Sequence, residues 1–124
     1  MKKDIVDIKD IELLVNTFYQ KVLNDHSLAI FFNHVNWEHH LPIMYQFWEN
    51  ALFYTGNYSG NPMKSHQTIH EKHPMHELDF DQWISHFTQT VDELFEGEIA
   101  DLAKQRALSI ATVMKIKLIN KALH

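Results

Sequence analysis

The sequence predicts an all-α protein of a single domain, and three observations indicate this. Apolar residues recur every three or four positions through most of the chain, which is the period of a helix with one buried face. Glycine and proline, which interrupt helices, number only three each. The chain has 124 residues, enough for one hydrophobic core and too few for two. We therefore expect one helical domain covering residues 1–124.

The first helix is predicted from an apolar stripe over residues 11–22. Asp7 or Asp10 can cap its start, and Asn24 and Asp25 mark its end. The apolar cluster over 28–32 is too short for a periodicity argument, and we interpret it as a single helical turn. The stripe itself consists of Ile11, Leu14, Val15, Phe18 and Val22.

A second helix is predicted where Trp37, Leu41, Met44 and Trp48 form a stripe. Pro42 is tolerated only near the start of a helix, which places His40 at the entrance of this one. The stretch 55–62, Thr-Gly-Asn-Tyr-Ser-Gly-Asn-Pro, has the composition of a loop, and 63–76 is expected to be irregular or weakly helical. Two further stripes predict the last two helices, from Phe80 to Leu94 with an end near Gly97, and from Ile99 to Met114.

Composition limits the classes of function. No cysteine is present, which excludes disulfides and thiolate metal ligands. The formal charge of −5, with no block of basic residues, argues against nucleic acid as a partner. No apolar run is long enough for a membrane span, and the N-terminus has no apolar signal core. We expect a cytoplasmic protein without membrane contact.

Four polar or aromatic residues stand out on the apolar stripes. Tyr19 shares the face of Phe18, so its hydroxyl needs a partner; the simpler alternative is a core tyrosine bonded to a backbone carbonyl. His40, which shares a face with Met44 and Phe47, is by default a structural histidine. Trp83 is by default a core aromatic with an indole N–H to satisfy. Arg106 falls between Ala103 and Ala107 on the inward face, where it meets a carboxylate or extends to solvent.

Four of the ten histidines lie close together at positions 66, 70, 73 and 76. His66 and His70 have the i,i+4 spacing of helical metal sites, but a third ligand is missing. For His70, His73 and His76 the simpler interpretation is surface histidines beside a proline-containing loop. His66 differs by its neighbourhood, because it follows the turn-rich loop and Pro62-Met63, between two aromatic segments.

In combination, these features resemble the group III truncated hemoglobins from about Leu14 to Ala111, and the resemblance includes Arg106-Ala107. The motifs that carry it are Phe18-Tyr19, Leu28 through Phe32, Trp37-Glu38-His39-His40-Leu41, Met44, Phe47-Trp48, Tyr58-Ser59-Gly60-Asn61-Pro62-Met63, His66 and Phe80-x-x-Trp83.

The resemblance implies a shortened globin fold, a two-over-two helical sandwich, holding a pentacoordinate heme b (iron protoporphyrin IX). His66 then ligates the iron, Tyr19 hydrogen-bonds the bound ligand, and His40 gates or contacts the pocket on that distal side. The indole of Trp83 faces the same side, so Tyr19, His40 and Trp83 are the candidate catalytic residues. The implied heme contacts are Phe32, His40, Met44, Phe47, Met63, His66, Trp83 and Arg106.

Two departures from the family pattern concern the elements that flank the pocket. Leu28-Ala29-Ile30 stands where Leu-Gly-Pro is common, which predicts a longer helical turn before Phe32. The interval from His66 to Trp83 is a few residues longer than in close relatives. If the register differs accordingly, His70 rather than His66 is the iron ligand.

The implied function is binding of O₂, NO or CO, as in oxygen transport. Turnover of NO or peroxide with a reductase partner, which would make the protein an enzyme, stays open. Two other classes also remain. One is a non-heme metal protein built on the histidines of residues 66–76; the other is a helical interaction module, for which no heptad or exposed apolar face is evident.

Overall fold

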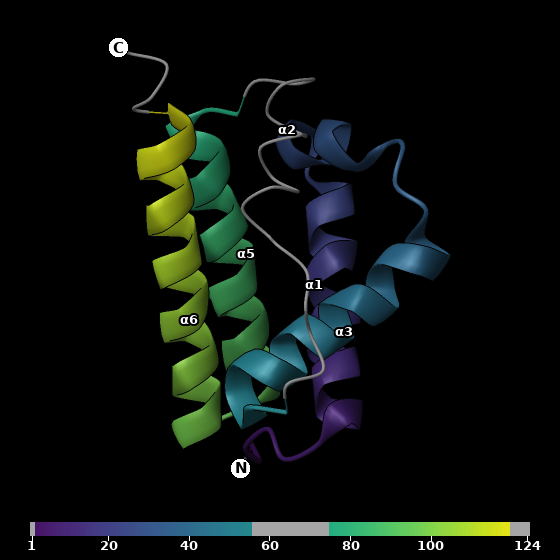
Figure 1. Cartoon of the computed structure of the whole chain (residues 1–124), viewed down its shortest axis with the longest axis vertical. Coiled ribbons are helices and arrows are strands. Elements are labelled where there is room, and N and C mark those ends of the chain that lie inside the picture. The colour runs from purple at the N-terminus through teal and green to yellow at the C-terminus, as the bar shows by residue number, and fades with distance from the viewer. Residues whose placement is uncertain (1, 56–74, 120–124) are drawn as a thin grey trace.

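The computed structural model describes residues 2–55 and 75–119, and it confirms the all-helical class. No strand occurs in these two described ranges. Figure 1 shows the arrangement. The elements are α1 (Ile8–Asn24), α2 (His26–Ala29), the 3₁₀ turn η1 (Ile30–Phe32), α3 (Trp37–Phe53), α5 (Glu77–Leu94), α6 (Glu98–Met114) and the π-helical turn η2 (Lys115–Ile119).

The four long helices form two layers of two. Helix α3 crosses α1 obliquely, while α5 and α6 run antiparallel side by side (Figure 1). The layers meet because α1 packs against α5 and α3 packs against α6. This is the two-over-two sandwich that the resemblance implies.

Helix α1 begins and ends where the sequence predicts. Asp7 is its N-cap, and the Asp7 carboxylate accepts a hydrogen bond from the Asp10 backbone N–H at 3.1 Å. The whole predicted stripe from Ile11 to Val22 is buried. The helix ends at Asn24, and Asp25 starts the next element.

The single turn expected over residues 28–32 is two short consecutive turns, α2 and η1. Asp25 caps α2 by accepting the Ser27 N–H at 3.0 Å, and its other oxygen lies 2.8 Å from Nε2 of His86 on α5. The contact with His86, followed by the hydrogen bonds from Ser27, holds the pKa of Asp25 below its ordinary value. This pair joins the corner between α1 and α2 to α5.

Helix α3 starts at Trp37, so Pro42 lies in its second turn, one turn further in than expected. Proline lacks the N–H that would bond the carbonyl of Glu38. Both residues are exposed, so water can satisfy that carbonyl. The helix ends at Phe53, and its C-cap Tyr54 adopts the left-handed conformation (φ 57°) and donates its N–H to the Asn50 carbonyl at 2.9 Å.

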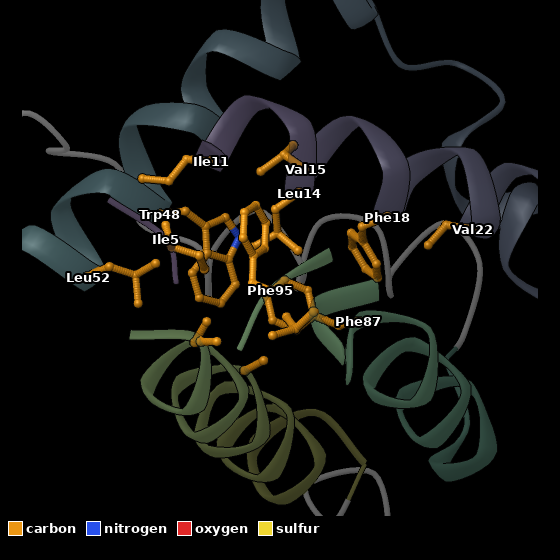
Figure 2. Close-up of a cluster of buried hydrophobic side chains, with 14 of the residues drawn as sticks. Ile5, Ile11, Leu14, Val15, Phe18, Val22, Trp48, Leu52, Phe87 and Phe95 are labelled. Atoms are coloured by element: carbon orange, nitrogen blue, oxygen red, sulfur yellow. The ribbon is translucent and has the colours of Figure 1, made fainter. Parts of the chain in front are cut away.

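The main core lies between the two layers (Figure 2). Trp48 from α3 stacks on Phe87 from α5 with ring centroids 4.7 Å apart, and Phe18 from α1 meets Phe87 edge-on at 5.3 Å. Helix α6 contributes small residues, because Ala103 and Ala107 are fully buried. Their size lets the backbone of α6 approach the aromatic cluster closely.

The start of α6 is capped by a residue from the other end of the chain. Its own N-cap is Gly97, which has no side chain to accept the first N–H groups. The Asp4 carboxylate accepts hydrogen bonds from Ile99 N–H at 2.9 Å and Ala100 N–H at 2.8 Å instead. Gly97 has a φ of 142°, and a Cβ there would lie 2.5 Å from Cγ of Asp4. Only glycine leaves room for this cap.

We expect Asp4→Ala to lower the free energy of unfolding at pH 7 by about 1–2 kcal/mol, the usual cost of losing a helix cap. Burial raises the pKa of Asp4, but the backbone hydrogen bonds from Ile99 and Ala100 outweigh it and leave the pKa below its ordinary value of 3.8. The carboxylate therefore stabilises the fold above the unfolded-state pKa, and this stability is lost as the pH falls through the lower folded-state pKa.

Chemical denaturation of the wild-type protein and of Asp4→Ala, at pH 7 and at strongly acidic pH, measures the difference in the free energy of unfolding at each pH. Asp101→Ala is the matched control, because Asp101 is an exposed carboxylate in the first turn of the same helix. Equal losses for Asp4→Ala and Asp101→Ala would contradict the capping role of Asp4.

Candidate functional site

Tyr19 and His40 form a hydrogen-bonded pair between α1 and α3. The Tyr19 hydroxyl lies 3.3 Å from Nε2 of His40, and both side chains are half-buried. The tautomer of His40 decides which of the two atoms donates. The partner of Tyr19 is thus a side chain from another helix and not the backbone carbonyl of the simpler alternative.

Aromatic rings surround the Tyr19 hydroxyphenyl group. The ring centroid of Tyr19 lies 5.1 Å from that of Phe18, 5.9 Å from Phe32, 5.0 Å from Trp37 and 5.6 Å from His40. Burial among these groups raises the pKa of the Tyr19 hydroxyl. The hydroxyl therefore keeps its proton in the physiological range and can serve as a hydrogen-bond donor.

An apolar cavity lies between the α2–η1 segment and the ends of α5 and α6 that face it, and neither Tyr19 nor His40 lines it. Its one acidic residue, Asp79, is already engaged, since its carboxylate accepts the His76 backbone N–H at 2.8 Å. Phe32 belongs to both features, because it lines the cavity and contacts Tyr19. The lining residues are Leu28, Phe31, Phe32, Met75, Asp79, Phe80, Trp83, Ala111 and Met114.

Trp83 also faces the cavity. The half-buried indole meets Phe18 edge-on at 5.7 Å and stacks on Phe87 at 6.1 Å. Phe18 therefore contacts both Tyr19 and Trp83. The structure brings Tyr19, His40, Phe32 and Trp83 into one aromatic neighbourhood.

The other predicted site residues fall into two groups. Met44 and Phe47 are half-buried on α3 and pack against the main core, and the Phe47 ring lies 5.3 Å from that of Trp48. Met63 and His66 lie outside the described residues, and so do His70 and His73. His76 caps the start of α5, so it has a structural role.

The expectation that Arg106 lies on the inward face of α6 is wrong. Its side chain is exposed and donates a hydrogen bond to the Tyr54 hydroxyl at 3.3 Å, at the end of α3. The buried face of α6 is occupied by Ala103 and Ala107, which leaves no room for a guanidinium there. Of the two alternatives, extension toward solvent is correct.

Sequence reasoning did not single out Trp37 as a site residue, although its indole contacts Tyr19 and His40. Trp37 precedes His40 by three positions, and residues at that spacing share a helix face. This spacing could have identified Trp37 as a site residue. It was not considered as one because it was assigned to the apolar stripe of its helix.

Within the described ranges, no group of three or more His, Asp or Glu side chains could hold a metal ion. The same ranges contain no helix long and apolar enough to cross a membrane.

Comparison with known proteins decides the family. The profile of the family described as "Bacterial-like globin" matches residues 5–119 of this chain. The chain is a bacterial-like globin. A curated relative, the group 3 truncated hemoglobin ctb of Campylobacter jejuni, is 28% identical over 118 residues, covering 90% of this globin and 91% of the relative.

A solved structure agrees with this assignment. The crystal structure of a group III truncated hemoglobin from Campylobacter jejuni matches this globin with a TM-score of 0.83 and 27% identity, covering 95% of each chain. The resemblance to group III truncated hemoglobins is therefore confirmed, and with it a heme-based, ligand-binding function for this globin.

The described residues suit a heme in their chemistry. Apolar and aromatic side chains such as Phe32, Phe80 and Trp83, which are the groups that contact porphyrin faces, lie together around the cavity, although its accessible volume of about 20 Å³ is far below that of a porphyrin. Tyr19, which contacts Phe32, and its partner His40 supply the polar groups that a diatomic ligand needs.

Proposed function

We propose that this globin holds a pentacoordinate b-type heme through His66 and binds O₂, with NO and CO as further ligands. The observation that supports this most is the Tyr19–His40 pair, which places two polar groups in an aromatic cluster that includes Phe32, a residue of the cavity wall. When bound, the heme supplies an iron atom that takes up a diatomic molecule.

The chain's own residues then determine how long the ligand stays. Tyr19 keeps its proton and donates a hydrogen bond to a ligand that carries partial negative charge, and the indole N–H of Trp83 is a second donor. In the tautomer whose Nε2 carries no proton, His40 accepts from the Tyr19 hydroxyl and competes with the ligand for it; in the other tautomer His40 donates to Tyr19 and leaves the hydroxyl proton available. The apolar walls exclude water, which strengthens each such bond.

The absorption spectrum of the purified, heme-supplemented protein tests this proposal. We expect a Soret band that shifts on reduction and again on addition of CO, and a pyridine hemochrome spectrum of the b type. A heme-supplemented sample without a Soret band would refute the proposal. The spectrum also separates a heme protein from a non-heme metal protein built on the histidines of residues 66–76.

A second candidate function is chemistry on bound ligands, with a reductase as partner in the cytoplasm. Two donors near the cavity favour slow release of O₂, which suits turnover of NO or peroxide better than oxygen transport. Consumption of NO by the oxygenated protein, measured with an NO electrode under a regenerating reductant, tests this function. Catalytic NO consumption would support it, and a single stoichiometric turnover would contradict it.

A further inference from the structure

Trp37 lies against the Tyr19–His40 pair. It is the first residue of α3, and its indole is 5.0 Å from the Tyr19 ring and 5.4 Å from the His40 ring, both in edge contacts. It also stacks on Phe32 at 6.0 Å with an interplanar angle of 28°. One indole therefore contacts both members of the pair and the cavity wall beside them.

The same indole lines an open groove between α1 and α3. Asn16 and Tyr45 close one part of this groove with a hydrogen bond of 2.5 Å from the Tyr45 hydroxyl. Tyr19 and Trp37 both line the groove, so water in the groove lies close to the Tyr19 ring and to the indole that contacts it. The groove is lined by Asn16, Tyr19, Gln20, Leu23, Trp37, Leu41 and Tyr45.

We propose that Trp37 is a positioning residue for the distal pair: it fixes the orientation of the Tyr19 and His40 rings and keeps groove water away from them. The proposal rests on the ligand-binding function proposed above. An indole suits this role because it is large and rigid, and edge contacts between rings restrict their relative orientation. The raised pKa of Tyr19 agrees with burial of its hydroxyl.

Trp37→Leu tests the proposal in the ferrous CO complex. Loss of the indole should let Tyr19 and His40 reorient and admit groove water. We expect the C–O stretching frequency, read by infrared spectroscopy, to shift and broaden. We also expect O₂ to dissociate about fivefold faster, which corresponds to roughly the loss of one hydrogen bond.

Two single variants and one double variant make the result specific. Trp37→Phe keeps an aromatic ring, so its C–O stretching band should lie close to that of the wild-type protein. Leu41→Ala opens the same groove from the same helix and should leave the spectrum almost unchanged. If Trp37 acts through Tyr19, then adding Trp37→Leu to Tyr19→Phe should cause little further change in O₂ dissociation.

The outcomes are distinguishable. A missing Soret band in the wild-type protein refutes the proposed function itself. A normal Soret band with an unchanged C–O stretch in Trp37→Leu, or equal shifts in Trp37→Leu and Leu41→Ala, overturns the positioning role. If Trp37→Leu does not fold, Trp37→Met replaces it, because Met keeps more volume without a ring. Failure of both to fold shows a folding role and also overturns the proposal.

Discussion

Replacement of His66 by Gly should release the heme, or leave a heme protein whose spectrum returns only when imidazole is added. The proposed bond between His66 and the iron is the one strong protein bond on that side, and free imidazole can occupy the space that the truncated side chain leaves. The measurement is the Soret absorbance after gel filtration, with and without imidazole. Among the changes considered for this globin, this one has the largest expected effect.

His70→Gly is the matched control, because the i,i+4 spacing and the long interval before Trp83 make His70 the alternative ligand. We expect His70→Gly to keep its heme. Heme loss from His70→Gly with a normal His66→Gly would assign the ligand to His70. Because heme binds the folded state, a variant that loses it should also melt at a lower temperature than the loaded wild-type protein.

Tyr19→Phe and Trp83→Phe should each speed O₂ dissociation by roughly five- to thirtyfold. Loss of one donor costs about 1–2 kcal/mol, and each 1.4 kcal/mol is tenfold in rate. Both substitutions keep an aromatic ring, so the contacts with Phe18, at 5.1 Å for Tyr19 and 5.7 Å for Trp83, are largely retained. Stopped-flow O₂ dissociation measures the effect.

The double variant distinguishes a shared ligand from two independent effects on packing. If Tyr19 and Trp83 donate to the same ligand, the effects of the two substitutions should not add. CO carries little charge when bound, so its dissociation should change far less than that of O₂. Equal changes for O₂ and CO would indicate a change in pocket shape, and an unchanged O₂ rate in Tyr19→Phe would make Tyr19 a core tyrosine.

The helices themselves could be predicted from the sequence with little error. The period of apolar residues placed α1, α3, α5 and α6, and the capping preference of Asp narrowed the start of α1 to Asp7 or Asp10, of which Asp7 is the cap. These features are local, because they depend on residues within one or two turns of one another. Pro42 was expected near the start of its helix, but it lies in the second turn. The helix tolerates it there because the carbonyl that it leaves unpaired belongs to an exposed residue, and this exposure depends on the tertiary structure and not on neighbouring residues in the sequence.

The candidate site could be predicted in part. Tyr19, His40, Phe32 and Trp83 were named from the family resemblance, and the structure brings them together. The pattern alone could not show that His40 is the partner of Tyr19. That contact depends on how α3 crosses α1, and a small change in the crossing would separate the two atoms. Residue roles toward the heme, and the assignment of His66, remain predictions.

Sequence alone therefore determined the fold class and the long helices, because both follow from the local period of apolar residues, and it indicated the family through motifs spread over most of the chain. Only the tertiary structure decided the contacts between residues far apart in the chain. Asp4 caps α6 by accepting N–H groups that lie 95 and 96 positions later in the chain, and Arg106 is exposed although its spacing suggested the inward face. Such contacts depend on where whole helices lie relative to one another, and the packing of Trp48, Phe87 and the small residues of α6 sets those positions.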